Sequence, residues 1–228
     1  INTDLANDLG NLVSRTTAMA GKYFGGRLPA GCGATEEEQK LAAAFAAPGV
    51  FGFSTKGEGP EKFDAELIAL ASTLRGRYEE AMEAFAPHKA LDEVFHVIQR
   101  ANKYIDENAP WALAKDMEAN GPRLARVLYN LLEATRICGV LLTPFMPESM
   151  EKLFGQIGAG ADLRTWDSVA AWGGLSETAA VTKGENLFPR VDAEKALQEL
   201  EEAAEAAKRA ALPAIEVEPQ LTEQVDFD

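Results

Sequence analysis

Apolar residues recur along this chain at the three- and four-residue spacing of an α-helix, and this periodicity restricts the fold more than any other feature. Apolar stripes of this kind run through residues 5–16, 61–86, 87–108 and 123–143. The alternation with a period of two that is typical of β-strands is nearly absent. Amphipathic helices must bury one face against each other, so the sequence predicts an all-α, antiparallel bundle of roughly four or five helices.

Glycine and proline predict where these helices begin and end. The first helix is expected to end at Gly21. After a loop-rich stretch at 25–33, an Ala/Glu-rich helix at 35–47 is expected to break at Pro48-Gly49. The long helix that begins at Glu61 is expected to close at Pro87, and Gly121-Pro122 is expected to end a short helix and open the next. Pro144 and Pro147 bound the end of the most apolar helix.

These signals divide the chain into four expected parts. Residues 1–157 form the helical bundle, and 158–192 form an irregular segment. A charged Ala/Glu/Lys helix at 193–212 has few large apolar residues to bury. The acidic stretch 213–228 is typical of a linker toward a further domain. Both ends interrupt a pattern, so we expect the sequence to be a piece of a longer protein.

Composition excludes several classes of function. The formal net charge is −14, which argues against nucleic-acid binding by a bulk positive field. The two cysteines and two histidines have no zinc-ligand spacing, and a disulfide framework is not expected. The sequence contains no secretory signal, no membrane-spanning apolar run and no phosphate-loop or hydrolase motif. We therefore expect a cytoplasmic protein with no catalytic residues, no metal ligands and no membrane contact.

The first of two polar clusters lies on the first predicted helix. Asn11 and Arg15 are four residues apart, so both project from one helix face. An amide and a guanidinium are the side chains that read base edges by paired hydrogen bonds. The alternative interpretation is an ordinary exposed polar face.

The second cluster is the predicted corner at residues 102–111, which ends in Pro110-Trp111. Proline suits the first turn of a helix, because no backbone hydrogen bond is lost there. A tryptophan exposed at such a corner is a stacking platform for an unpaired base. The alternative is a tryptophan that packs against the end of the bundle.

Four segments carry a resemblance to the bacterial methionyl-tRNA synthetases. These segments are residues 2–15, 102–116, 142–147 and 187–191, and they occur in the family's order. The resemblance covers about residues 1–157 and 186–192 and is weakest at 25–60. It implies the helix bundle of the class I aminoacyl-tRNA synthetase anticodon-binding type.

The resemblance also implies roles for individual residues. Asn11 and Arg15 would contact the CAU anticodon of tRNA(Met), and Trp111 would stack on its first base. Pro110 would fix the corner. Lys103 and Lys115 flank the corner, and their position makes them candidate phosphate contacts.

The family's adenylate-forming signatures, of the His-x-Gly-His and Lys-Met-Ser-Lys-Ser types, are absent from this sequence. The resemblance therefore implies no cofactor in this chain. ATP, and zinc where it is present, would belong to a catalytic half outside the chain, to which residues 158–192 would return. The parent enzyme would be a homodimer through a further C-terminal domain.

Two other interpretations remain open. The leucyl-, isoleucyl- and valyl-tRNA synthetases share the bundle but lack the combination of the Asn-Leu-x-Ser-Arg and Pro-Trp motifs. A helical protein–protein interaction module is the alternative from another class. The feature that distinguishes it is whether Asn11, Arg15 and Trp111 meet on one exposed patch.

Overall fold

The structure is a computed structural model, and it describes residues 2–45, 59–189 and 192–211. All regular structure in these ranges is helical, as the periodicity predicts. The elements are η1 (Asn2–Gly10, a π-helix), α1 (Asn11–Phe24), α2 (Glu36–Phe45), α3 (Pro60–Ser72), α4 (Leu74–Glu83), α5 (Pro87–Asn108), α6 (Pro110–Leu113), α7 (Met117–Leu142), α8 (Pro147–Ile157), the 3₁₀ turns η2 (Ala161–Arg164) and η3 (Asp167–Val169), and α9 (Ala193–Ala211).

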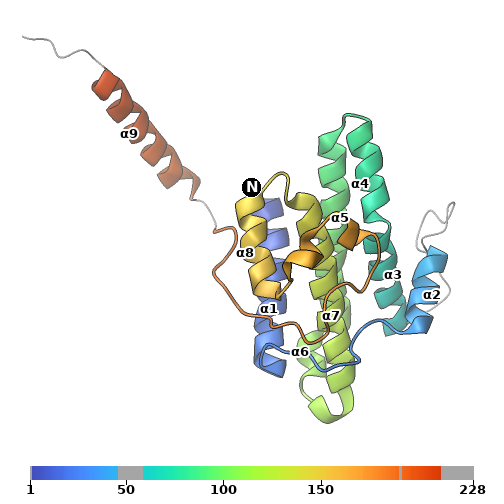
Figure 1. The fold of residues 1–228 in the computed structure, drawn as a ribbon. Helices are drawn as coiled ribbons and strands as arrows, with labels where there is room; N and C mark the ends of the chain where they lie inside the picture. Colours follow the sequence, from blue (N-terminus) through green and yellow to red (C-terminus); the bar gives the residue numbers. More distant parts are fainter. Residues whose placement is uncertain (1, 46–58, 190–191, 212–228) are drawn as a thin grey trace, which may run out of the picture. The chain divides into compact units, whose positions relative to one another are not determined.

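Helix α7 is the centre of the bundle. Every residue from Val127 to Leu142 is buried, and α1, α3, α5 and α8 all pack against this helix (Figure 1). A helix that is apolar on all sides must be enclosed by other helices. The short helix α6 lies at one end of the bundle, away from the connection between α4 and α5 (Figure 1).

Three predicted helix boundaries are wrong. The first helix passes through Gly21 and ends at Phe24. The left-handed backbone of the following Gly25 (φ 62°) lets the Gly26 N–H donate to the Ala20 carbonyl at 3.0 Å. The stripe at 61–86 forms two helices separated at Thr73, where Arg77 donates to the Leu70 carbonyl at 3.1 Å.

The third misplaced boundary is Gly121-Pro122, which lies inside α7. Asp116 caps this helix five residues earlier by accepting from the Ala119 N–H at 3.0 Å. Pro122 therefore removes one hydrogen bond near the start of a helix that already has a cap. The Ala/Glu-rich helix is observed as α2, and its predicted break at Pro48-Gly49 lies outside the described residues.

Residues 158–189 lie against the bundle, although they contain only two short 3₁₀ turns. The Val181 N–H donates to the Gly26 carbonyl at 2.8 Å, and the Thr182 N–H donates to the Gln156 carbonyl at the same distance. Beneath this segment, Glu133 and Arg136 of α7 form a fully buried ion pair at 2.8 Å. These two side chains bind the backbone of residues 163–175, and Val169, Leu175 and Val181 are buried in the core. The irregular segment is therefore fixed by hydrogen bonds and by apolar packing.

The contacts divide the chain into two units, Ile1–Pro189 and Arg190–Asp228. The second contains α9, which carries the exposed i,i+4 pairs Lys195–Glu199 and Glu205–Arg209. The predicted boundary at residue 157 remains a prediction. Within the described ranges, no helix has the length and apolar character needed to cross a membrane. Cys32 and Cys138 are free and buried.

Candidate nucleic-acid interface

The corner after α5 exposes an indole ring. Ala109 adopts the left-handed conformation (φ 42°, ψ 60°), and its N–H donates to the Ile105 carbonyl at 2.9 Å. The buried Pro110 then begins α6, as the sequence predicts. Trp111 follows with 47% of its surface exposed, so it does not pack into the end of the bundle. Its ring is available to a planar ligand.

Arg15 approaches this ring from a different helix. Its Cζ atom lies 5.9 Å from the centroid of the Trp111 ring, within the range of a cation–π contact. Its Nη2 atom lies 3.4 Å from the Asp106 Oδ1 atom in the last turn of α5. Three helices, α1, α5 and α6, therefore meet at the Arg15 guanidinium.

Asn11 is the first residue of α1, where the π-helix η1 passes into an α-helix. It is exposed and lies one turn before Arg15, on the same helix face. The preceding Gly10 has little room, because a Cβ atom there would lie 3.1 Å from the Leu5 carbonyl oxygen and 3.6 Å from the Phe188 ring. The segment around Phe188 thus packs beside the start of α1.

The two candidate phosphate contacts are exposed, but their surroundings differ. Lys103 forms an i,i+4 ion pair with Glu107 at 3.6 Å, which offsets part of its charge. Lys115 is exposed and directly precedes Asp116, the N-cap of α7. The positive charge near the corner is therefore local and small.

Sequence reasoning did not assign roles to Asn102 and Asp106, although both lie in the second polar cluster. The Asn102 amide donates to the Asp8 carbonyl of η1 and to the Ile98 carbonyl of α5, both at 3.2 Å. This residue holds α5 against η1, just as Asp106 holds Arg15. Their four-residue spacing places them on one face of α5, and that is the signal in the sequence that identifies them.

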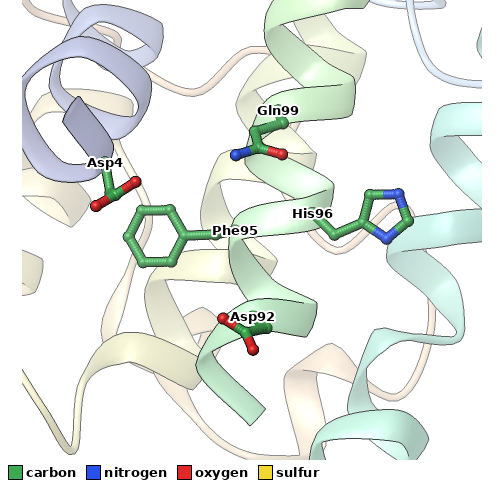
Figure 2. Close-up of a pocket in the computed structure, with 5 residues that line it drawn as sticks. All are labelled: Asp4, Asp92, Phe95, His96 and Gln99. Carbon is green, nitrogen blue, oxygen red and sulfur yellow. The ribbon is translucent and has the colours of Figure 1, made fainter. Parts of the chain in front are cut away.

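A separate hollow lies between η1 and α5. It is lined by Asp4, Asp92, Phe95, His96 and Gln99. Figure 2 shows Phe95 pointing toward the helix that carries Asp4, while His96 points to the other side of α5. The two carboxylates disfavour a phosphate backbone. The described residues contain no cluster of three His, Cys, Asp or Glu side chains that could hold a metal ion.

A family model described as the anticodon binding domain of methionyl tRNA ligase matches residues 55–209. The matched region includes Lys103, Pro110, Trp111 and Lys115, whereas Asn11 and Arg15 precede it. Longer matches come from methionine–tRNA ligases. That of Caldanaerobacter subterraneus subsp. tengcongensis is 44% identical over 205 residues, which is 90% of this chain and 28% of the relative. That of Bacillus subtilis is 43% identical and covers 86% of this chain and 26% of the relative.

Solved structures of Mycobacterium tuberculosis methionyl-tRNA synthetase are similar to this fold. The free form superposes with a TM-score of 0.66 at 32% identity, over 84% of this chain and 33% of that one. The form bound by methionyl-adenylate superposes with a TM-score of 0.65 at 33% identity, over 83% and 32%. This chain thus spans about a third or less of the length of each of these proteins.

Proposed function

This chain belongs to the methionine–tRNA ligase family and contains its anticodon-binding domain, and we propose that Asn11, Arg15 and Trp111 read the CAU anticodon of tRNA(Met). The observation that carries the proposal is the contact between Arg15 and the exposed Trp111 ring. A stacking ring and a base-reading guanidinium are adjacent there, although 95 residues separate them in the sequence. At 47% exposure, part of the Trp111 side chain is open to a ligand, which favours stacking over a tryptophan that packs wholly against the bundle end.

Each residue has a distinct task in this proposal. The Trp111 indole stacks on the first anticodon base, which contributes about 1–3 kcal/mol. Arg15 donates hydrogen bonds to acceptors on the base edges, and the Asn11 amide can both donate and accept there. The ring of Pro110 restricts φ at the start of α6 and so sets the direction of α6, and with it that of the Trp111 indole, relative to α5.

The net charge of −14 does not oppose this role, because base recognition depends on local groups. Asp106 holds the Arg15 guanidinium beside the ring, so Arg15 is ordered before the RNA arrives. Lys103 and Lys115 are the proposed phosphate contacts around the corner. Most of the nonspecific attraction would then come from the rest of the enzyme.

The activity of the whole enzyme is part of the same proposal. A catalytic half outside this chain would activate methionine with ATP, in keeping with the methionyl-adenylate bound to the Mycobacterium tuberculosis enzyme. Zinc in that half, a homodimer and a cytoplasmic location remain predictions. In this arrangement the present chain selects tRNA(Met) and the catalytic half aminoacylates it.

The test is a titration of this chain with two anticodon stem-loops of tRNA(Met), one with CAU and one with an altered anticodon. We expect CAU to bind at least about fivefold more tightly, because one well-formed base contact contributes about 1–3 kcal/mol. Equal binding of both stem-loops with a strong salt dependence would contradict the proposal. The same titration with the full ligase distinguishes a misplaced reading surface from one that needs the catalytic half.

A further inference from the structure

Asn108 directly precedes the corner at residues 109–111 and holds it in place. Asn108 is the last residue of α5, and its Nδ2 atom donates to the Tyr104 carbonyl at 2.9 Å. Its Oδ1 atom accepts a hydrogen bond from the Arg123 guanidinium of α7. Ala109 then adopts the left-handed conformation, which costs a residue with a Cβ atom about 1–2 kcal/mol. A corner with this backbone needs support from its surroundings.

Arg123 receives its own support from a fully buried carboxylate on α3. Its Nη2 atom lies 2.8 Å from the Asp64 Oδ1 atom, and its Nη1 atom donates to the other oxygen, so the pair is bidentate. Asp64 is 0% exposed and also accepts from the Tyr104 hydroxyl. Asn130 of α7 donates to that hydroxyl at 3.2 Å. Three helices, α3, α5 and α7, are thus joined directly beneath the corner.

Two hydrogen-bond donors of this network, Tyr104 and Arg123, keep their protons at neutral pH. Burial, together with the neighbouring Asp64 carboxylate, raises the pKa of Tyr104 well above its ordinary value, so its hydroxyl stays a donor. Burial opposes the charge on Arg123, but the hydrogen bond to Asp64 and the adjacent charges outweigh it and raise the pKa of Arg123. Every donor therefore keeps its proton, and the direction of each hydrogen bond is fixed.

We propose that Arg123 is a positioning residue for the anticodon-reading tryptophan, acting through Asn108 from its anchor on Asp64. This inference rests on the proposed function and adds residues that do not touch the RNA. The guanidinium is suited to the task because its planar group can donate to a carboxylate and to a second acceptor at once. A lysine ammonium at the same place keeps the charge opposite Asp64 but has no fixed fork.

The experiment removes the Arg123–Asn108 bond from each side. Asn108→Ala deletes the acceptor, together with the bond from the Asn108 amide to the Tyr104 carbonyl, and leaves the Arg123–Asp64 pair intact. Arg123→Lys keeps a cation beside Asp64 and loses the geometry. We expect each variant to bind the CAU stem-loop about three- to tenfold more weakly, because a side chain that is no longer pre-ordered must be ordered on binding.

Arg77→Lys is the matched control. Arg77 also joins two helices, with its Nε atom 2.7 Å from the Glu93 carboxylate of α5. Glu93 lies about 22 Å along α5 from Asn108. This variant should lower the stability to urea, although less than Arg123→Lys because Glu93 is partly exposed whereas Asp64 is fully buried. It should leave CAU binding within about twofold of the parent.

Two further readouts separate positioning from general stability. If Arg123 acts through Asn108, the double variant binds no more weakly than the weaker single variant. In the free protein, the ¹⁵N–¹H indole resonance of Trp111, assigned by its loss in Trp111→Phe, should shift in Asn108→Ala and Arg123→Lys but not in Arg77→Lys.

Additive losses in the double variant, or unchanged CAU affinity in either single variant, would overturn the inference. If the parent chain has no CAU preference, the proposed function fails, and the indole resonance alone decides the positioning role. An unshifted resonance in Arg123→Lys would then exclude that role. A shifted resonance would retain it for a corner with a different ligand.

Discussion

Two regions of the molecule place an arginine against an exposed tryptophan, and they differ in everything around that pair. In the proposed reading surface, Arg15 of α1 lies 5.9 Å from the centroid of the Trp111 ring. In the irregular segment, Arg75 of α4 lies 4.8 Å from the centroid of the Trp166 ring. Their exposed fractions, 47% for Trp111 and 36% for Trp166, are similar. The side chains alone do not distinguish the two sites.

The surroundings do distinguish them. Arg75 also donates to the Trp166 carbonyl at 3.4 Å, and the Tyr78 ring lies 5.9 Å from the Trp166 ring. These contacts attach the segment around Trp166 to α4. Trp111 has Arg15 as its only described cation–π or ring partner. We infer that Trp166 is a structural contact and that Trp111 is held ready for a ligand.

The largest effect is expected at Arg136, which holds the irregular segment that contains Trp166. Arg136 donates to the Leu163 carbonyl at 2.9 Å and to the Ser168 carbonyl at 3.0 Å, and it pairs with the fully buried Glu133. Arg136→Met leaves that carboxylate unpaired, so we expect it to lower the free energy of unfolding in urea by about 3–5 kcal/mol. CAU binding by the remaining folded fraction should be unchanged.

The paired variant Glu133→Gln/Arg136→Met controls for the unpaired charge. Replacing both members of a buried pair is far less damaging than removing one. If the double variant is no more stable than Arg136→Met, the unpaired Glu133 carboxylate is not the cause of the lost stability.

The next effect compares the two tryptophans directly. Trp111→Ala should weaken CAU stem-loop binding by about 1–3 kcal/mol, the contribution of one base stacked on an aromatic ring. Trp166→Ala should leave the affinity unchanged and lower the free energy of unfolding instead. Isothermal titration and urea unfolding of both variants measure the two quantities. Equal losses of affinity in the two variants would mean that Trp111 has no special role.

A smaller effect is expected from Arg75, the arginine that contacts the Trp166 ring. Arg75 is partly exposed, and its cation–π contact with Trp166 contributes about 0.5–1 kcal/mol. Arg75→Ala should therefore lower the midpoint of urea unfolding only slightly and leave stem-loop affinity as in the parent. Arg15→Ala should weaken CAU stem-loop binding and leave the midpoint of urea unfolding nearly as in the parent. If Arg75→Ala weakens CAU binding, the segment around Trp166 is part of the RNA surface.

The smallest effect concerns the lysines beside the reading surface. Lys103→Ala and Lys115→Ala should each weaken CAU and altered stem-loops alike. Each should make the slope of log K against log salt concentration less steep by up to about 0.7, the value for one phosphate of a single strand. Because Lys103 is paired with Glu107 at 3.6 Å, we expect the larger change at Lys115. A change in anticodon preference would show that a lysine contacts a base.

Local rules in the sequence predict the helices and the corner, because their causes are local. Proline at the start of α6 and the apolar stripes of α5 and α7 follow from backbone geometry and periodicity. The break at Thr73 depends on a side-chain contact from Arg77 to the Leu70 carbonyl, and no pattern in the sequence indicates it. Gly21 and Gly25 carry the same local signal for the end of a helix, so the sequence alone does not decide which of them ends α1.

The candidate site was predictable only in part. Its residue types and the resemblance to a known family indicate Asn11, Arg15 and Trp111, but their roles remain proposals. The contact between Arg15 and Trp111 joins residues that are distant in the sequence, so no local pattern specifies it. From the sequence alone, Trp166 is as good a candidate for an exposed tryptophan as Trp111. Only the partners of each ring separate a stacking surface from a structural contact.

The most direct test of the central claim measures the Trp111 ring itself. In a Trp166→Phe/Trp172→Phe background, Trp111 is the single fluorescent indole, since the sequence has three tryptophans. We predict saturable quenching by the CAU stem-loop, and weaker quenching by an altered anticodon at the same concentration, because a stacked base contacts the ring. Fluorescence that does not change while the CAU stem-loop binds would contradict the claim, because the RNA would then contact another surface.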